Sequence, residues 1–294
     1  MLNISIRNKA RQFSKLVRHS AITRRTGKSS KPVLAKTGQM AVTFIGHSSF
    51  LIQIGGQNIV IDPNYAKWIF VLKRLRRPGV KVRDLPPIDI VMVSHAHFDH
   101  LHRPSLRAIV RHTHRLTGRA PLLMVPEHVS DLVSDLGFRK IVELAWWEEC
   151  HTHGLTITHT PSRHWGARVI RDMHRGFGGF VVKSSKHSFY HSGDTAYFDG
   201  FAEIGRRLQP ELALLPIGAY NPPSFRNVHT SPEDAVQAFR DMNARWMVPM
   251  HYGTFRLSHE PMDEPVQKLE HEAKRFGLTD RVLVLQEGIT RIFS

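Results

Sequence analysis

The chain has 294 residues, of which 41% are hydrophobic, and this is enough to bury one large core or two small ones. Its single cysteine, Cys150, excludes an intrachain disulfide and a thiolate zinc knot, and favours a reducing compartment, so we expect a cytoplasmic protein. No run of about 18 apolar residues is present, so we expect no membrane-spanning helix. The net charge of +16 favours anionic partners: nucleic acid, phosphate esters or an anionic lipid surface.

Residues 1–36 form a strongly basic segment with only a weak amphipathic pattern. A solvated tail and a basic helix that lies on an anionic membrane both remain open for this segment. We expect a flexible N-terminal segment at 1–36, with a peripheral contact to the membrane as the alternative, and one folded domain at 37–294.

The first half of this domain alternates β-rich runs with helical patterns. Strands are predicted at 41–46, 50–55 and 58–63, and Gly55–Gly56 predicts a hairpin between the second and the third. Residues 64–88 look like an irregular insertion with aromatic and basic residues. A short β-branched run ends at Ser94; then a helix is expected at 105–115, a strand at 121–126 and a helix at 127–136.

The second half repeats this alternation. Strands are predicted at 140–144, 155–161, 179–184, 188–195, 211–218 and 245–253, with a closing strand pair at 282–293. Helices are predicted at 197–207, 231–242 and 262–276; Ser231 should cap the second of these, because Pro232 and two acidic residues follow it. Hairpins mixed with βα units predict an α/β fold, in which two packed sheets with helices outside form a four-layer αββα sandwich.

The stretch VMVSHAHFDHLH, residues 91–102, contains four potential metal ligands within six residues: His95, His97, Asp99 and His100. In a helix, His97 would point away from His95 and Asp99. In a loop at the end of a strand all four can converge, and the β-branched run before them favours this arrangement. We therefore predict a metal site here, with a solvated His-rich loop as the alternative.

Three further ligand types follow later strands: His164, Asp194 and His251. The seven candidates are five histidines and two aspartates without cysteine, a set that suits Zn²⁺, with Mn²⁺ or Fe²⁺ as alternatives. Seven ligands exceed the need of one tetrahedral ion, and are enough for two ions that share a carboxylate.

The HAHFDH motif resembles the HxHxDH signature of the metallo-β-lactamase fold superfamily, and the later order His, Asp, His is also that of the superfamily. The match runs from about residue 41 to residue 292. It implies the αββα fold and a metallo-β-lactamase-like hydrolase domain at 37–294. It also implies a first ion at His95, His97 and His164, a second at Asp99, His100 and His251, and Asp194 as the bridge. His47, in GHSSF, would support the ligands or lie at the surface.

A closer resemblance is to N-acyl-phosphatidylethanolamine-hydrolysing phospholipase D and its bacterial relatives. It rests on SHAHFDHL, the HW after Arg163, GDTAYF, LPIGAY, NVHTSPEDAV and MHYGTF. It implies that His229 lies at the rim of the site and matters for activity; packing against Pro222 and Pro223 is the alternative. His102 stands where an acid often follows the signature, and Gly166 and Ala167 stand where more basic residues are usual.

The resemblance implies a binuclear zinc hydrolase, with two Zn²⁺ per chain. We expect a phosphodiesterase of phospholipase D type that acts in lipid metabolism on N-acyl-phosphatidylethanolamine-like lipids through a metal-bound hydroxide. Asp99 or Asp194 would orient the water, and His229 would hydrogen-bond the phosphate or protonate the leaving group. The alternatives are a metal-dependent lactonase or β-lactam hydrolase, and a nucleic-acid-binding or nucleolytic protein.

Expected partners follow from the same resemblance and from the charge. They are a phospholipid or another anionic phosphodiester as substrate, a homodimer, and no specific nucleic acid, because no nucleic-acid-binding motif is visible. Arg168, Arg171 and Arg175 follow His164 and suit an anionic head group; a solvated basic face is the equal alternative.

Overall fold

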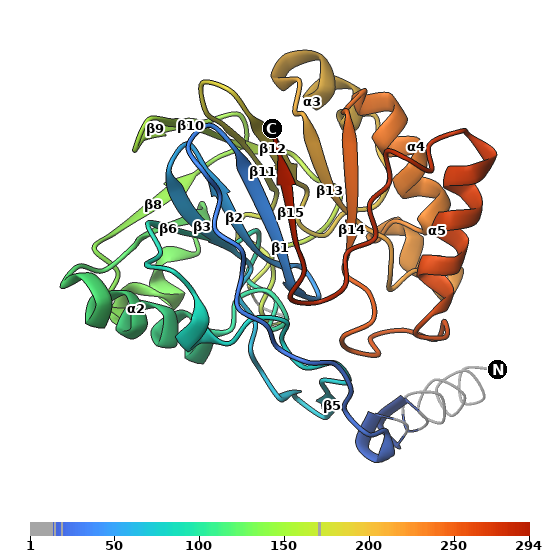
Figure 1. The fold of residues 1–294 in the computed structure, drawn as a ribbon. Helices are drawn as coiled ribbons and strands as arrows, with labels where there is room; N and C mark the ends of the chain where they lie inside the picture. The colour runs from blue at the N-terminus through green and yellow to red at the C-terminus, as the bar shows by residue number, and fades with distance from the viewer. Residues whose placement is uncertain (1–13, 15, 19, 170–171) are drawn as a thin grey trace.

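The computed structural model describes residues 14, 16–18, 20–169 and 172–294. Two large sheets face each other and helices cover their outer faces (Figure 1). The predicted four-layer αββα sandwich is confirmed.

The first sheet has the strand order β15-β1-β2-β3-β6-β7-β8. Hairpins make β1, β2 and β3 antiparallel, whereas β3, β6, β7 and β8 run parallel. The bounds are β1 Met40–Gly46, β2 Ser49–Ile54, β3 Gln57–Ile61, β6 Ile90–Met92, β7 Leu122–Pro126, β8 Lys140–Leu144 and β15 Thr290–Phe293.

The second sheet has the order β14-β13-β12-β11-β10-β9. Its strands β9 to β12 are antiparallel neighbours, and β12, β13 and β14 are parallel. The bounds are β9 Glu149–Thr152, β10 Leu155–Thr160, β11 Gly179–Lys183, β12 Ser188–His191, β13 Leu212–Pro216 and β14 Trp246–Met250. As a result β10, β12 and β14 all point in the same direction.

Helix α2 (Arg103–Thr117) covers the first sheet, and α3 (Gly200–Leu208), α4 (Pro232–Met242) and α5 (Glu264–Arg275) cover the second (Figure 1). Side chains of β6 show how the sheet serves two cores. Ile90 and Met92 belong to the apolar cluster that includes residues of both sheets, and Val91 belongs to the cluster under α2 with Leu106. Successive side chains of a strand point to opposite faces of its sheet. Because this sheet is covered on both faces, neighbouring residues of β6 are buried in different cores.

Helix α4 begins as predicted. The Ser231 hydroxyl accepts a hydrogen bond from the Asp234 backbone N–H, and the Asp234 carboxylate accepts one from the Ser231 N–H. This capping box satisfies two backbone donors that the first turn leaves free, with Pro232 in the first helical turn.

The helix predicted at 127–136 is wrong. The chain forms two short 3₁₀ turns there, η2 (Ser130–Leu132) and η3 (Ser134–Leu136). His128 has φ +60°, and the Glu143 carboxylate of β8 accepts the backbone N–H groups of Val129 and Ser130. Serine, aspartate and β-branched valine all weaken a helix, so this outside acceptor can take over the first donors.

Other differences from the prediction concern one strand end and several short elements. Strand β12 ends at His191, so Asp194 lies on the following loop. The expected pair at 282–293 is the single strand β15 with an isolated bridge between Met247 and Val282. The insertion at 64–88 contains a hairpin of β4 (Trp68–Ile69) and β5 (Leu72–Lys73), as well as η1 (Val82–Asp84). Strand β9 was not predicted, because its polar residues carry little strand signal.

Of the basic N-terminal segment, residues 1–13, 15 and 19 lie outside the described residues. Residues 23–36 run along the domain: the Ser30 hydroxyl donates to the Gly288 carbonyl, and the Val33 N–H donates to the Thr290 hydroxyl. The division of the chain at residue 36 stays a prediction. No helix in the described part of the chain has the length and apolar character that a bilayer span requires.

Candidate metal centre

The seven predicted ligands meet at one edge of the sandwich. The loop with His95, His97, Asp99 and His100 follows β6 of the first sheet, and His164, Asp194 and His251 follow β10, β12 and β14 of the second. The carboxyl ends of parallel strands share one sheet edge, where open α/β sheets place their sites. The alternative of a solvated His-rich loop is wrong, because His95 and His100 are buried.

The backbone near Asp194 leaves room only for glycine. Gly193 has φ +62°, and a Cβ there would lie 2.5 Å from the Gly178 carbonyl oxygen and 2.9 Å from the Ser94 Cβ. The loop after β12 therefore passes directly against the start of the ligand loop after β6. This contact joins the two sheets at the site.

Three histidines form the first group. His95 Nε2 lies 2.9 Å from His97 Nδ1, and His164 Nε2 lies 3.3 Å from the same atom. Tetrahedral zinc with bonds near 2.0–2.1 Å separates its ligand atoms by about 3.4 Å. The three nitrogens are therefore close to the spacing that one ion requires.

The second group surrounds two carboxylates. His251 Nε2 lies 3.0 Å from Asp194 Oδ2 and 3.6 Å from Asp99 Oδ2. His100 Nε2 lies 3.3 Å and 3.6 Å from the same two oxygens. Asp194 Oδ2 also lies 4.0 Å from His164 Nε2, so this one carboxylate faces both groups.

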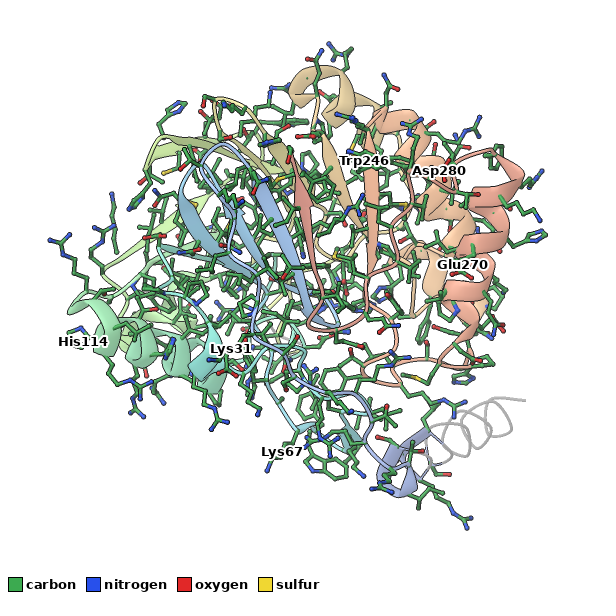
Figure 2. All side chains as sticks on the ribbon, in the orientation of Figure 1. Lys31, Lys67, His114, Trp246, Glu270 and Asp280 are labelled. Atoms are coloured by element: carbon green, nitrogen blue, oxygen red, sulfur yellow. The ribbon has the colours of Figure 1, made fainter. Side chains whose placement is uncertain are left out.

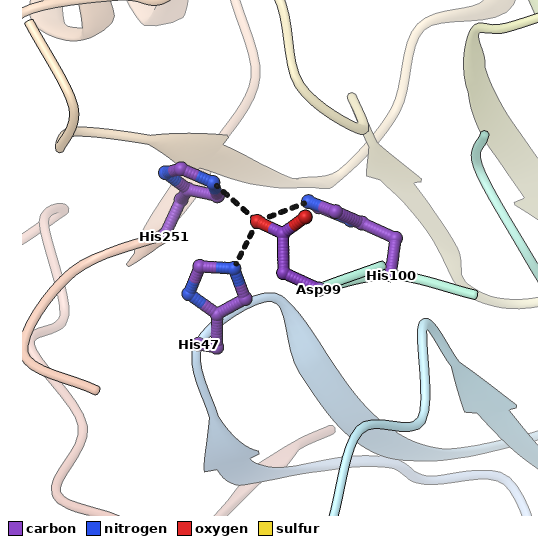
Figure 3. A group of neighbouring side chains, drawn as sticks. All are labelled: His47, Asp99, His100 and His251. Atoms are coloured by element: carbon purple, nitrogen blue, oxygen red, sulfur yellow. Dashed lines mark hydrogen bonds and ion pairs between the residues drawn. The ribbon is translucent and has the colours of Figure 1, made fainter. Parts of the chain in front are cut away.

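His47 joins the second group. Its Nε2 lies 3.0 Å from Asp99 Oδ2, as Figure 3 shows together with His100 and His251. Its ring is buried, and its backbone has φ +61° in the turn between β1 and β2. Of the two roles expected for His47, a surface position is wrong and contact with a predicted ligand is observed.

Burial and charge act against each other in this cluster. Burial lowers the pKa of His95 and His164 well below the usual value, so both are neutral and can offer a nitrogen lone pair. Burial also disfavours the charged form of Asp194, yet His100 and His251 hold its pKa well below the usual value. Conversely, Asp194 overcomes the effect of burial on His251 and raises its pKa to about 9.

Several polar atoms of the cluster face carboxylates at ion-pair distance but make no hydrogen bond. Among the described residues, His100 Nε2, Asp194 Oδ1 and His251 Nε2 are buried without a hydrogen bond. Buried polar atoms are almost always satisfied, and two ionised carboxylates in such a place demand positive charge. The site therefore fits a metal ion.

His229 lies beside this cluster, on the loop after η4 (Pro223–Asn227). Its Nδ1 is 3.7 Å from Asp194 Oδ2 and has no hydrogen-bond partner, and its ring centroid is 5.3 Å from that of His251. The neighbouring Val228 carbonyl lies 2.9 Å from His164 Nδ1, which fixes the loop to a predicted ligand. Burial lowers the pKa of His229 to about 4, so its ring is neutral.

Asp62 was missed from the sequence. This fully buried carboxylate accepts hydrogen bonds from the Ser94 N–H and hydroxyl, and lies 2.7 Å from His100 Nδ1. It holds the His100 ring so that Nε2 faces Asp99 and Asp194. The signal was present, because Asp62 follows the carboxyl end of a buried strand, β3, as the predicted ligands follow the ends of theirs.

Arg168 and Arg175, two of the arginines predicted to meet a head group, bind groups of the protein itself. One Arg168 nitrogen donates to the carbonyls of Ala96 and Leu101, and its guanidinium lies 3.9 Å from the centre of the Phe98 ring. Arg175 is buried and pairs with Asp131 and Asp172. Arg171 lies outside the described residues. An anionic head group therefore finds neither Arg168 nor Arg175 free.

Comparison with known proteins agrees with this geometry. A family model described as the beta-lactamase superfamily domain matches residues 57–252. An uncharacterized protein of Mycobacterium tuberculosis, Rv0906, is 35% identical over 242 residues, which are 79% of this chain and 63% of that protein. The chain thus spans less than two thirds of the mycobacterial relatives that it matches.

Two further relatives carry functional names. N-acyl-phosphatidylethanolamine-hydrolyzing phospholipase D 1 of Caenorhabditis elegans is 34% identical over 78% of this chain and 68% of its own. A UPF0173 metal-dependent hydrolase of Rubrobacter xylanophilus is 31% identical over 85% of this chain and 96% of its own. Among solved structures, the metallo hydrolase Igni18 of Ignicoccus hospitalis has a TM-score of 0.63 and 25% identity, covering 87% of this chain and 99% of that one.

Proposed function

Because the chain belongs to the metallo-β-lactamase superfamily, we propose that it is a binuclear zinc phosphodiesterase of phospholipase D type. The chain is a metal-dependent hydrolase of this superfamily, and its substrate is an N-acyl-phosphatidylethanolamine-like lipid. Hydrolysis of the bond between phosphorus and the ethanolamine oxygen releases an N-acylethanolamine and leaves a phosphatidic acid.

The observation that carries the substrate class is the position of His229. A neutral imidazole beside Asp194, with Nδ1 unpartnered, adds a hydrogen-bonding group that the seven ligands do not supply. A phosphodiester has two oxygens free to accept such a bond, as well as an oxygen leaving group. The relation to the C. elegans phospholipase D supports the same reading.

His95, His97 and His164 would hold the first zinc ion, Asp99, His100 and His251 the second, and Asp194 both. When bound, the two ions supply Lewis acidity, which lowers the pKa of a water and stabilises negative charge on phosphate oxygens. Asp99 Oδ2 can accept a hydrogen bond from the attacking water and so orient it toward phosphorus.

His229 then contributes a hydrogen bond to a phosphate oxygen. Its pKa of about 4 means that the ring carries one proton at neutral pH, on either nitrogen. A neutral ring with one N–H donates to the phosphate, and it has no second proton to release to the leaving group. The first of the two roles expected for His229 is therefore the one that we retain.

The test compares Asp194→Asn, His229→Gln and the wild type, with His271→Gln on the exposed side of α5 as the matched control. We measure bound zinc and hydrolysis of an N-acyl-phosphatidylethanolamine, of bis(p-nitrophenyl) phosphate and of a lactone. Asp194→Asn should lose most of its zinc. His229→Gln should keep it and lose about 100-fold or more in kcat, as is typical of a lost transition-state donor. The control should match the wild type.

Two outcomes contradict the proposal. Full activity of His229→Gln would remove the role of this side chain. Rapid lactone turnover with inert diesters would favour a hydrolase of carbonyl centres instead.

A further inference from the structure

The hairpin β4–β5 exposes apolar side chains at its tip. Trp68, Phe70 and Val71 are 48%, 73% and 45% exposed, and Phe70 and Val71 are the two residues of the turn. Two neighbouring large apolar side chains at the tip of a tight turn leave water unfavourably ordered around them.

Local turn chemistry does not explain these residues. Phe70 has φ +51°, in the left-handed region that glycine, asparagine and aspartate adopt most easily. An aromatic residue followed by a β-branched one is among the least suitable choices for such a turn. A local conflict of this kind is expected where a surface has a function.

The base of the hairpin holds the tip rigidly. Ile69 is buried in a small apolar cluster with Ala66 and Phe255. The Arg74 guanidinium is fully buried and donates to the carbonyls of Asn64 and Ala66. The exposed tip is therefore presented by a fixed element.

A cationic pocket adjoins the tip. It has a volume of about 330 Å³ and its lining is basic apart from the indole of Trp68. The lining residues are Arg24, Arg25, Lys67, Trp68, Lys73 and Arg77. No carboxylate within the described part of the chain pairs with any of these cations. We call these residues, with Phe70 and Val71, the hairpin patch; Figure 2 shows Lys67 at this edge of the molecule.

Two of these cations donate hydrogen bonds to backbone carbonyls and keep their positive charge. Lys73 Nζ donates to the carbonyls of Ala21 and Thr23, and Arg77 donates to that of Gly27. Carbonyl oxygens orient these cations without neutralising them. The pocket thus keeps a net positive charge that attracts anions.

We propose that the hairpin patch docks the protein on an anionic lipid bilayer, with Phe70 and Val71 inserted among the acyl chains and the cations on lipid phosphates. Apolar side chains that enter the interface together with cations that remain at head-group level are the features that peripheral membrane proteins use. Nucleic acid fits less well, because Val71 offers no stacking face and the tip projects from the domain (Figure 1).

The patch lies next to the candidate metal centre. The Phe70 ring centroid is 4.4 Å from that of Phe98, and Phe98 stands between His97 and Asp99 in the ligand loop. A bilayer that receives the hairpin therefore lies against the same edge of the domain as the site. Docking itself needs no turnover, so it can be tested apart from the proposed reaction.

The experiment measures cosedimentation of the full chain with vesicles of phosphatidylcholine alone, and of phosphatidylcholine mixed with phosphatidylglycerol. The wild type should bind the anionic vesicles much more tightly, and added salt should weaken this binding. Phe70→Ser with Val71→Ser should reduce the partition coefficient about tenfold or more. Arg24→Glu with Lys67→Glu should reduce it roughly fivefold or more for each charge.

Exposed residues of α2 provide the matched controls. Leu116→Ser changes a side chain that is 50% exposed, and Arg111→Glu reverses the charge of another exposed residue. Both controls should bind vesicles like the wild type. The proposal is overturned if the wild type ignores anionic vesicles, if hairpin and control variants lose binding equally, or if the hairpin variants bind as the wild type does. It is also overturned if duplex DNA displaces the wild type from the vesicles while the two double variants of the hairpin patch still bind lipid.

Discussion

Asp62 shows how one buried side chain orients its neighbours. Its two oxygens accept hydrogen bonds from the backbone N–H and the hydroxyl of Ser94, and one of them faces Nδ1 of His100. The imidazole must therefore present Nε2 to Asp99 and Asp194. Burial raises the pKa of a carboxyl, but the contact with His100 more than offsets this for Asp62 and lowers its pKa. A carboxylate behind a histidine ligand also raises the basicity of that ligand.

Asp62→Asn keeps the shape of the side chain and removes the charge. We expect zinc affinity to fall roughly 10- to 100-fold, the range that outer partners of metal ligands typically contribute. Competition with a chromophoric chelator measures this loss. Asp280→Asn, an exposed change at the same residue type, is the control (Figure 2). Unchanged affinity in Asp62→Asn would show that the His100 ring needs no such support.

His159 provides a test of acid stability away from the metal ligands. It is buried beside Phe180, and burial lowers its pKa to about 4 from the usual 6.5. Below pH 6.5 the unfolded chain takes up this proton before the folded one, so the stabilisation present above pH 6.5 is lost as the pH falls toward 4. The loss amounts to at most about 3 kcal/mol for this side chain.

Urea unfolding between pH 4 and pH 8 checks this expectation. His159→Gln removes the titrating group, so the fall in unfolding free energy below pH 6.5 should be shallower than in the wild type. His271→Gln, exposed on α5, should retain the full slope. Equal slopes for the His159 variant and the wild type would contradict the argument.

At the scale of elements, the ligand loop depends on a distant segment. Arg168 donates to the carbonyls of Ala96, between two ligands, and of Leu101, which follows the last ligand of the loop, and its guanidinium covers Phe98. The loop between residues 94 and 102 is thus braced from outside by a residue that comes after β10. This brace keeps four side chains converged that a free loop would spread.

Arg168→Lys tests the brace with a cation that has no planar fork. A lysine ammonium can also donate to carbonyl oxygens, but it cannot lay a planar group on the Phe98 ring or reach the same positions. We expect a loss of about 1–3 kcal/mol in unfolding free energy, measured by urea titration. Arg111→Lys on α2 should cost almost nothing. If Arg168→Lys were as stable as the wild type, the brace would be dispensable.

Local patterns determine which elements could be predicted. The β-rich runs, the Gly55–Gly56 hairpin and the cap at Ser231 follow from short-range preferences, and all are present. The helix predicted at 127–136 is wrong because Glu143, from strand β8, accepts hydrogen bonds from the backbone of this segment. Likewise the order of the ligand types could be read along the chain. The contacts of Asp62 with His100 and of Arg168 with the ligand loop were not predicted, because they exist only after the chain has folded.

At the scale of the whole molecule, metal and fold should stabilise each other. The candidate ligands come from both sheets, and no unfolded chain brings them together, so an ion that binds them favours the native state. Native-state binding at 100 times Kd contributes about 2.7 kcal/mol, and for a chain of this size that corresponds to a Tm change of roughly 5 °C or more.

Calorimetry before and after chelation measures this change. The chelated protein should melt roughly 5 °C or more below the untreated one, and zinc should restore the Tm while magnesium should not, because nitrogen ligands suit zinc better. Asp194→Asn should melt at the same temperature with and without chelator. A chelator-independent Tm in the wild type would mean that the cluster contributes its stability without an ion.

The pairing of β15 with β1 joins the last strand of the chain to the first (Figure 1). During synthesis the ribosome releases Met40 long before Phe293, so β1 keeps one edge unpaired until roughly 250 further residues, up to β15, have followed it. His251, the last member of the cluster, also emerges late. A nascent chain therefore exposes an unpaired strand edge and an incomplete ligand set during that interval, and this is when pairing with the edge of another chain is easiest.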